Sequence, residues 1–179
     1  MTSCPLAGGS SRWHIALMVS KRLSREAGHR RKFLAVIDET PECERAVAYA
    51  ARRAKNTNGA LVMLFVVDNS DFQQILGVGE IMHQEANERA RATLEKFAAK
   101  AREQQGIEPE LIIREGRTSE ELTTLIDEDQ DIAILVLAAG SGKEGPGPLV
   151  QSLAGRSQFQ IPVTVIPAGL ADDDIDAVT

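Results

Sequence analysis

The sequence predicts an α/β fold built on an open, doubly wound parallel sheet of five strands in a single domain. Two continuous apolar runs carry this prediction: 33–37 leads directly into Asp38, and 132–139 leads into the glycine-rich segment 140–148. Such runs are typical of parallel strands covered on both faces. Because open parallel sheets bind ligands outside the carboxyl ends of their strands, we expect a carboxylate and a glycine loop to meet at one edge.

Strands and helices alternate from residue 32 onward, as in a parallel sheet. The first helix is expected to begin with Thr40 as its N-cap and Pro41 in its first turn, and to end at Asn58 and Gly59. The third opens at Thr118. Expected strands cover 33–37, 60–67, 110–113, 132–138 and 161–167, and the other helices cover about 80–104 and 149–157.

Apolar side chains recur at helical spacing in these segments, which gives each helix one inward face. The inward positions are Ala46, Val47, Ala50, Ala51 and Ala54 in the first helix, Met82, Ala86, Ala90, Leu94, Phe97 and Ala101 in the second, and Leu122, Leu125 and Ile126 in the third. Right-handed crossovers then place the first and fourth strands side by side at a switch point, in a domain of flavodoxin-like size. Prolines 162 and 167 favour an edge position for the last strand.

Charge divides the chain unevenly. Residues 1–32 hold seven Lys or Arg and one acid, a net of +6, whereas residues 33–179 have a net charge of −12. We therefore expect a basic, disordered extension over 1–31, an acidic domain over 32–169 and an acidic, mobile tail over 170–179. Met18 is an alternative start, in which case 1–17 would not belong to the protein. An acidic body argues against nucleic acid as a partner, since nucleic-acid binding depends on neutralising phosphates.

Other classes are disfavoured by what the sequence lacks. No apolar run approaches the roughly 18–20 residues that span a bilayer, so no membrane association is expected. Cys4 and Cys43 form neither a disulfide framework nor a metal site, and a cytoplasmic location is expected. No nucleophile with a neighbouring base and no metal cluster can be proposed, which favours binding over catalysis.

Several segments resemble the universal stress protein family over about 32–168. They are 33–40 (FLAVIDET), 44–50 (ERAVAYA), 64–68 (LFVVD), the pattern Gly142-x2-Gly145-x9-Gly155, and 161–166 (IPVTVI). The resemblance implies a five-stranded fold of the adenine nucleotide α-hydrolase-like kind and a homodimer formed through the last strand, 161–167. It also implies a role in stress response, and the family divides into members that bind ATP and members that do not.

The resemblance also implies the residues of a nucleotide site, at the edge formed by the first and fourth strands. Asp38 would contact the nucleoside and Val66 would pack near the base of ATP, or of another adenine nucleotide bound with Mg²⁺. Gly142, Gly145 and Gly155 would hold the phosphates with the hydroxyl of Ser157. If the fourth strand is aligned by its apolar run, the family's first glycine falls on Ala138. Glycines allow close approach of the backbone to an anion.

Two alternatives remain open at this point. Arg156 stands where binding members have Ser or Thr, and Pro146 and Pro148 interrupt the loop, which favours a dimeric interaction module without a nucleotide. The glycines would then only serve turns, and Asp38 would only cap the next turn. The enzymatic alternative is a slow ATPase or a phosphoryl or adenylyl transferase.

Overall fold

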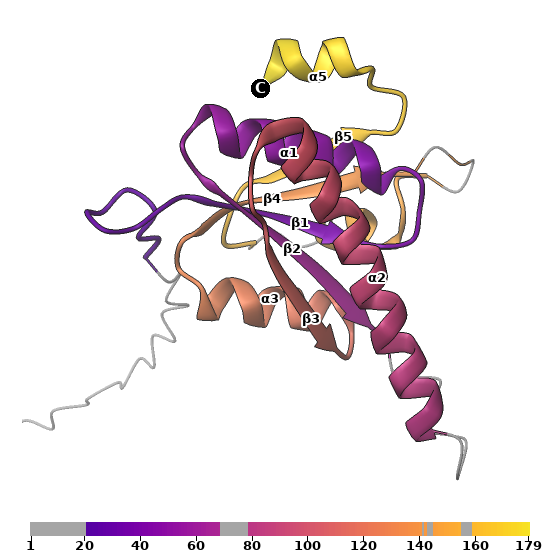
Figure 1. The fold of residues 1–179 in the computed structure, drawn as a ribbon. Coiled ribbons are helices and arrows are strands. Elements are labelled where there is room, and N and C mark those ends of the chain that lie inside the picture. Colours follow the sequence, from indigo (N-terminus) through magenta and orange to yellow (C-terminus); the bar gives the residue numbers. More distant parts are fainter. Residues whose placement is uncertain (1–20, 69–78, 141, 143–144, 155–158) are drawn as a thin grey trace, which may run out of the picture.

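The computed structural model describes residues 21–68, 79–140, 142, 145–154 and 159–179, and it shows the expected α/β fold (Figure 1). Its strands are β1 (Lys32–Ile37), β2 (Ala60–Val67), β3 (Glu110–Glu115), β4 (Ile132–Ala139) and β5 (Val163–Pro167). Its helices are α1 (Cys43–Asn56), α2 (Gly79–Gln105), α3 (Thr118–Glu128), α4 (Pro148–Ala154) and α5 (Asp172–Val178).

The five strands form one sheet in the order β3-β2-β1-β4-β5, and every neighbouring pair is parallel. The expected adjacency of the first and fourth strands is therefore confirmed, as is the edge position of β5. The last strand is shorter than expected, because Ile161 and Pro162 precede it. Pro162 has no N–H to donate to a ladder, although its carbonyl accepts a hydrogen bond from the Leu135 N–H at 3.0 Å.

Helices cover both faces of the sheet. One buried cluster joins side chains of β1, β2 and β4, including Phe33 and Met63, to α1 and α2. The other joins β1, β2 and β4 to α3 and α4 through residues such as Leu122 and Leu153. Within the described residues, no helix is long and apolar enough to cross a bilayer.

The start of α1 differs from the expectation that Thr40 caps it. The carboxylate of Asp38 accepts hydrogen bonds from both the backbone N–H and the hydroxyl of Thr40, at 2.9 and 2.5 Å. The hydroxyl is thus used in a turn, and the helix begins only at Cys43. Glu42 holds the N-cap position without a side-chain cap.

The acidic tail expected over 170–179 is helical over 172–178. These residues form α5, which packs against α1 and lies beyond it in Figure 1. Its Ile175 is fully buried, and Asp172 pairs with Arg45 at 2.8 Å. An acidic run is usually a solvated one, but here arginines on α1 supply the opposite charge.

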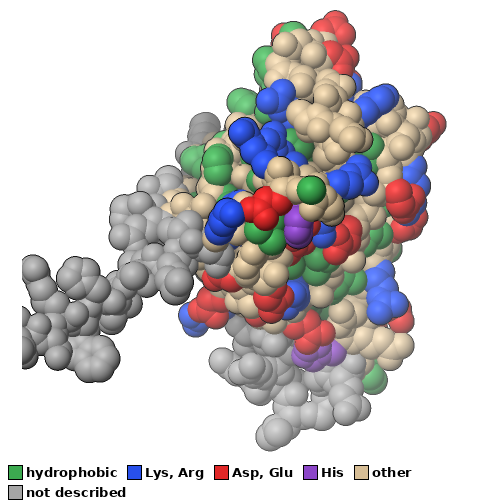
Figure 2. Space-filling view, turned by 90° about the vertical axis from the view of Figure 1, so that its left-hand side faces the viewer, with side chains coloured by type: hydrophobic (Ala, Val, Ile, Leu, Met, Phe, Trp, Pro, Cys, Tyr) green, Lys and Arg blue, Asp and Glu red, His purple; other side chains and the backbone are tan. Residues whose placement is uncertain are grey.

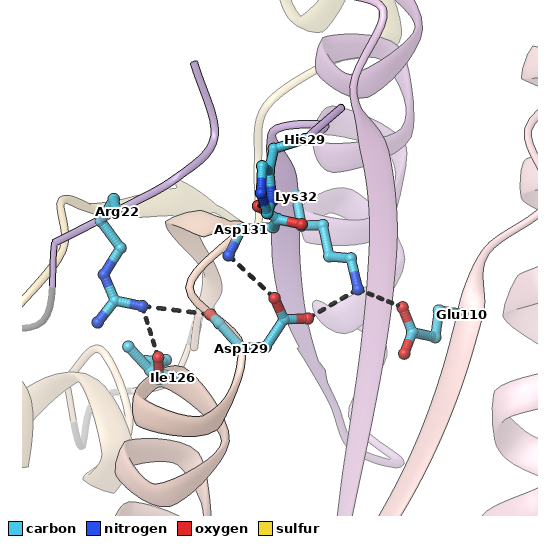
Figure 3. A network of polar contacts seen from close by, with 7 residues as sticks. All are labelled: Arg22, His29, Lys32, Glu110, Ile126, Asp129 and Asp131. Carbon is cyan, nitrogen blue, oxygen red and sulfur yellow. Dashed lines mark hydrogen bonds and ion pairs between the residues drawn. The ribbon is translucent and has the colours of Figure 1, made fainter. Parts of the chain in front are cut away.

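Of the extension expected over 1–31, residues 21–31 contact the domain, whereas 1–20 lie outside the described residues. Arg22 donates hydrogen bonds to the carbonyls of Ile126 and Asp129, at the carboxyl end of α3 (Figure 3). His29 Nδ1 lies 2.8 Å from Asp131 Oδ1. This segment therefore packs against the edge of the sheet at which the strands begin.

Lys32 ties that edge together, since its Nζ lies 2.7 Å from Asp129 and 2.8 Å from Glu110 (Figure 3). Burial alone would lower the pKa of Lys32, but hydrogen bonds to the two carboxylates outweigh it and raise the pKa.

The face in Figure 2 carries interspersed basic, acidic and hydrophobic side chains.

Gly59 provides a test of packing at the same edge. A Cβ atom there would lie 2.7 Å from the carbonyl oxygen of Arg31, which itself accepts the Ala60 N–H at 2.8 Å. We expect Gly59→Ala to lower the free energy of unfolding by about 1–3 kcal/mol in urea denaturation, because backbone must shift. Gly169→Ala is the control, since a Cβ there meets nothing within 4 Å. Equal stability of the two variants would contradict this account.

Candidate functional site

A cavity of about 530 Å³ opens at the carboxyl ends of the strands. Its floor is formed by the last residues of β1, β2 and β4, and its walls come from the β3–α3 connection and the start of α4. The residues that line it are Val36, Ile37, Asp38, Thr40, Glu42, Phe65, Val66, Asp68, Arg117, Thr118, Ser119, Leu137, Ala138, Gly140, Pro146, Gly147, Pro148, Leu149, Val150 and Ser152. It thus lies at the switch point, where parallel sheets bind ligands.

Three residues proposed from the sequence meet in this cavity: Asp38, Val66 and Ala138. Asp38 Oδ1 is held by Thr40, which is the turn-capping role that the sequence also suggested. Its second oxygen, Oδ2, makes no hydrogen bond within the described part of the chain. The turn therefore orients the carboxylate and leaves one acceptor for a ligand. The two interpretations of Asp38 are compatible.

The glycine loop forms one rim of the cavity. Gly140 lines it directly, whereas Gly142 and Gly145 lie in the loop beside it and are joined by a hydrogen bond from the Gly145 N–H to the Gly142 carbonyl at 3.3 Å. Gly145 has a φ of +92° and Gly147 a φ of +95°, a conformation that favours glycine. At these positions the backbone turn by itself accounts for glycine. Gly155 and Ser157 lie outside the described residues, as do Lys143 and Arg156.

Arg117, Thr118 and Ser119 form a wall of the cavity, and none of them was predicted as a site residue. These polar residues follow Gly116 at the start of α3 and belong to no apolar pattern. They could have been predicted from the rule that parallel strands end at one edge of the sheet, because β3 ends two residues before Arg117. Arg117 is the one basic residue of the described lining, which also holds the carboxylates of Asp38, Glu42 and Asp68.

Cys43, the first residue of α1, lies beneath this edge and is fully buried. Its Sγ is 3.8 Å from the carbonyl oxygen of Val36, the distance of a weak hydrogen bond donated by the thiol. Burial, together with the charge of Asp38, raises the pKa of Cys43 to about 12, although a backbone hydrogen bond at Asp38 acts in the opposite direction. The thiol is thus a packing group at neutral pH.

The described residues contain no group of three or more His, Cys, Asp or Glu side chains placed to hold a metal ion. Any Mg²⁺ at this edge would have to receive most of its ligands from phosphates and water, as is common for this ion.

The fold is that of an α/β protein with a cavity at the switch point of its parallel sheet. The family model of the universal stress protein family matches residues 29–167, and the chain belongs to that family. No match was found among the curated proteins.

Solved structures of the family share this fold. Universal stress protein UspA from Lactobacillus plantarum is 15% identical with a TM-score of 0.65, and the match covers 77% of this chain and 98% of that one. A universal stress protein in complex with cAMP is 18% identical with a TM-score of 0.56, over 76% and 96% of the two chains. One from Archaeoglobus fulgidus in complex with dAMP is 16% identical with a TM-score of 0.53, over 76% and 97%.

The raised pKa of Cys43 predicts a loss of stability in alkali. Unfolding exposes a thiol of pKa about 9.0, whereas the folded one ionises only near 12, so the unfolded state releases its proton first as pH rises. Between these values the free energy of unfolding should fall by about 1.4 kcal/mol per pH unit more in the wild type than in Cys43→Ala. Urea denaturation of both proteins at pH 8 to 11 measures this difference. Parallel pH profiles would contradict it.

Proposed function

We propose that the protein is a regulatory, cytoplasmic member of its family that binds ATP or a related adenine nucleotide in the cavity at the β1 and β4 edge. The observation that carries the proposal is the meeting of Asp38, Val66 and Ala138 in one cavity of about 530 Å³. The two relatives with bound cAMP and dAMP support adenine nucleotides as the class of ligand.

Asp38 is proposed to bind the ribose. A carboxylate oxygen that is fixed by a turn and lacks a donor is complementary to a sugar hydroxyl, and such charge-assisted hydrogen bonds are among the stronger ones. Thr40 restrains the carboxylate before a ligand arrives, which reduces the entropic cost of binding.

The apolar part of the cavity is proposed to hold the base. Phe65 and Val66 at the end of β2 are only partly buried, as is Ala138 on β4, so their exposed surfaces face the cavity. A flat, largely apolar base would cover these surfaces and remove them from water.

The phosphates are proposed to lie along the glycine loop. Gly140, Gly142 and Gly145 present backbone without side chains there, and Gly155 and Ser157 remain proposed contacts. Three carboxylates line the described cavity against one arginine, so a triphosphate would need countercharge, and Mg²⁺ carried in with ATP supplies it. We propose binding rather than turnover.

Asp38→Asn tests the site. Asparagine can still accept the Thr40 hydrogen bonds through its oxygen. Its NH₂ group stands in place of Oδ2, however, and cannot accept a hydrogen bond from a ribose hydroxyl. We expect affinity for Mg-ATP and AMP, measured by calorimetry, to fall by roughly tenfold or more, as for the loss of a hydrogen bond to a charged group. Glu39→Gln is the control, because it removes the neighbouring charge outside the lining. Equal affinities of the two variants would refute the role of Asp38.

The second candidate is an interaction module that binds no nucleotide, and the excess of carboxylates in the lining favours it. Purified protein that carries no nucleotide after denaturation, and that binds neither Mg-ATP nor AMP, would replace the first proposal by this one.

We also propose a homodimer that pairs through β5. This strand is at an edge of the sheet, and its Val165 is 39% exposed. An exposed edge strand with an apolar side chain is prone to pair with another strand.

Val165→Lys should convert the dimer to a monomer, because charged side chains on an edge strand oppose pairing. Native mass spectrometry at about 10 µM, a concentration typical of such assays, measures the change. The control is Leu111→Lys, a change of similar exposure (37%) on the opposite edge strand β3. A dimer that survives Val165→Lys, or one that only Leu111→Lys disrupts, would contradict pairing through β5.

A further inference from the structure

Helix α5 lies outside the segment that matches the family model, which ends at residue 167. It follows β5 after a short connection and packs against α1 (Figure 1). The family fold is therefore complete without it. The family fold therefore does not explain why the surface of α1 carries the contacts that hold α5.

Three arginines of α1 hold α5 in place, and we call Arg45, Arg52 and Arg53 the arginine face. Arg45 pairs with Asp172 at 2.8 Å. Arg52 Nε pairs with Asp176, and its Nη2 lies 3.7 Å from Asp172. Arg53 donates to the carbonyl oxygen of Thr179 at 2.8 Å. All three side chains thus reach acceptors of the α5 segment.

The fit between α5 and this face is incomplete. Arg52 is 87% buried, since only 13% of its side chain is exposed, yet its Nη1 atom is buried without a hydrogen-bond partner in the described residues. An unsatisfied buried donor is costly, and a ligand that supplied one more acceptor would remove that cost.

The hold on α5 is also weak. The helix has seven residues, too few to be stable alone, and Ile175 is its one fully buried side chain. Its paired acids Asp172 and Asp176 are 63% and 61% exposed, so water and salt screen both ion pairs. The helix can therefore leave α1 without unfolding the domain.

We propose that the arginine face is a docking surface for an acidic helical segment of a partner protein, and that α5 occupies this surface in cis as a competitor. The partner segment carries acids at positions i and i+4 and an aliphatic residue at i+3, the spacing of Asp172, Asp176 and Ile175. Charge complementarity and the unsatisfied Arg52 donor favour this kind of partner. This inference goes beyond nucleotide binding and does not depend on it.

The test uses the full chain and a fluorescent peptide of residues 168–179 as the probe. In Ile175→Asp, a charged side chain replaces a fully buried one, so the chain's own helix should release the arginine face. We expect this variant to bind the peptide at least tenfold more tightly than the wild type does, because a tethered helix competes at an effective concentration in the millimolar range. Raised salt should weaken the binding, and Arg52→Ala added to Ile175→Asp should abolish it.

Two peptide variants provide a matched control. Asp176→Asn removes an acid that pairs with Arg52, whereas Asp173→Asn removes an exposed acid with no ion pair among the described residues. The first should weaken binding at least fivefold and the second less than twofold, in keeping with a short-range contact and a screened charge. An unrelated acidic peptide with Glu, Leu and Glu at positions i, i+3 and i+4 should bind as tightly as the probe.

Absence of peptide binding to a folded Ile175→Asp variant would overturn the proposal, as would failure of the unrelated peptide to bind. If Ile175→Asp does not fold, hydrogen exchange of the wild-type protein provides the test. The backbone amides of α5 should then exchange well before those of α1. If the amides of both helices exchange only through global unfolding, the proposal is overturned. A wild-type dimer that Ile175→Asp alone dissociates would identify a second copy as the occupant and also overturn it.

Discussion

The pairing of β1 with β4 is the constraint on which the candidate site depends. These strands are separated by almost a hundred residues and lie side by side in the sheet. The connection after β1 leads to α1 on one face, and the connection after β4 leads to α4 on the other. Because the two connections part in opposite directions, they leave a cavity between Asp38 and Gly140, whose floor is the carboxyl ends of the strands.

The two edges of the sheet are built differently. At the amino ends, Lys32 joins Asp129 to Glu110, and the segment 21–31 closes over the edge through Arg22 and His29. At the carboxyl ends, the polar groups of the lining surround open space. Charges are paired across the first edge, whereas the second keeps a group such as Asp38 Oδ2 for a ligand. This division is common where function lies on loops carried by a rigid scaffold.

Sequence patterns were informative wherever one physical effect dominated. The run 60–67 is continuously apolar, and β2 has these bounds because burial alone decides them. The prediction for Thr40 was wrong because the Asp38 carboxylate competes for its hydroxyl, and a pattern of capping residues cannot weigh one local hydrogen bond against another. The helix formed by the acidic run of α5 could not be predicted from local sequence, because its partners Arg45 and Arg52 lie more than a hundred residues away. Arg117 was missed because exposed polar residues leave no periodic signal.

Arginines hold both segments that flank the family domain, and the acceptors of Arg22 and Arg52 make the two attachments different. Arg22 donates to backbone carbonyls at the end of α3, which no longer find partners within the helix. These carbonyls are part of the fold, so Arg22 caps that helix through groups that the domain always presents. Arg52 instead pairs with two exposed carboxylates, which salt can screen and another acid can replace. The amino-terminal segment therefore belongs to the domain, whereas α5 behaves as a bound ligand that happens to be tethered.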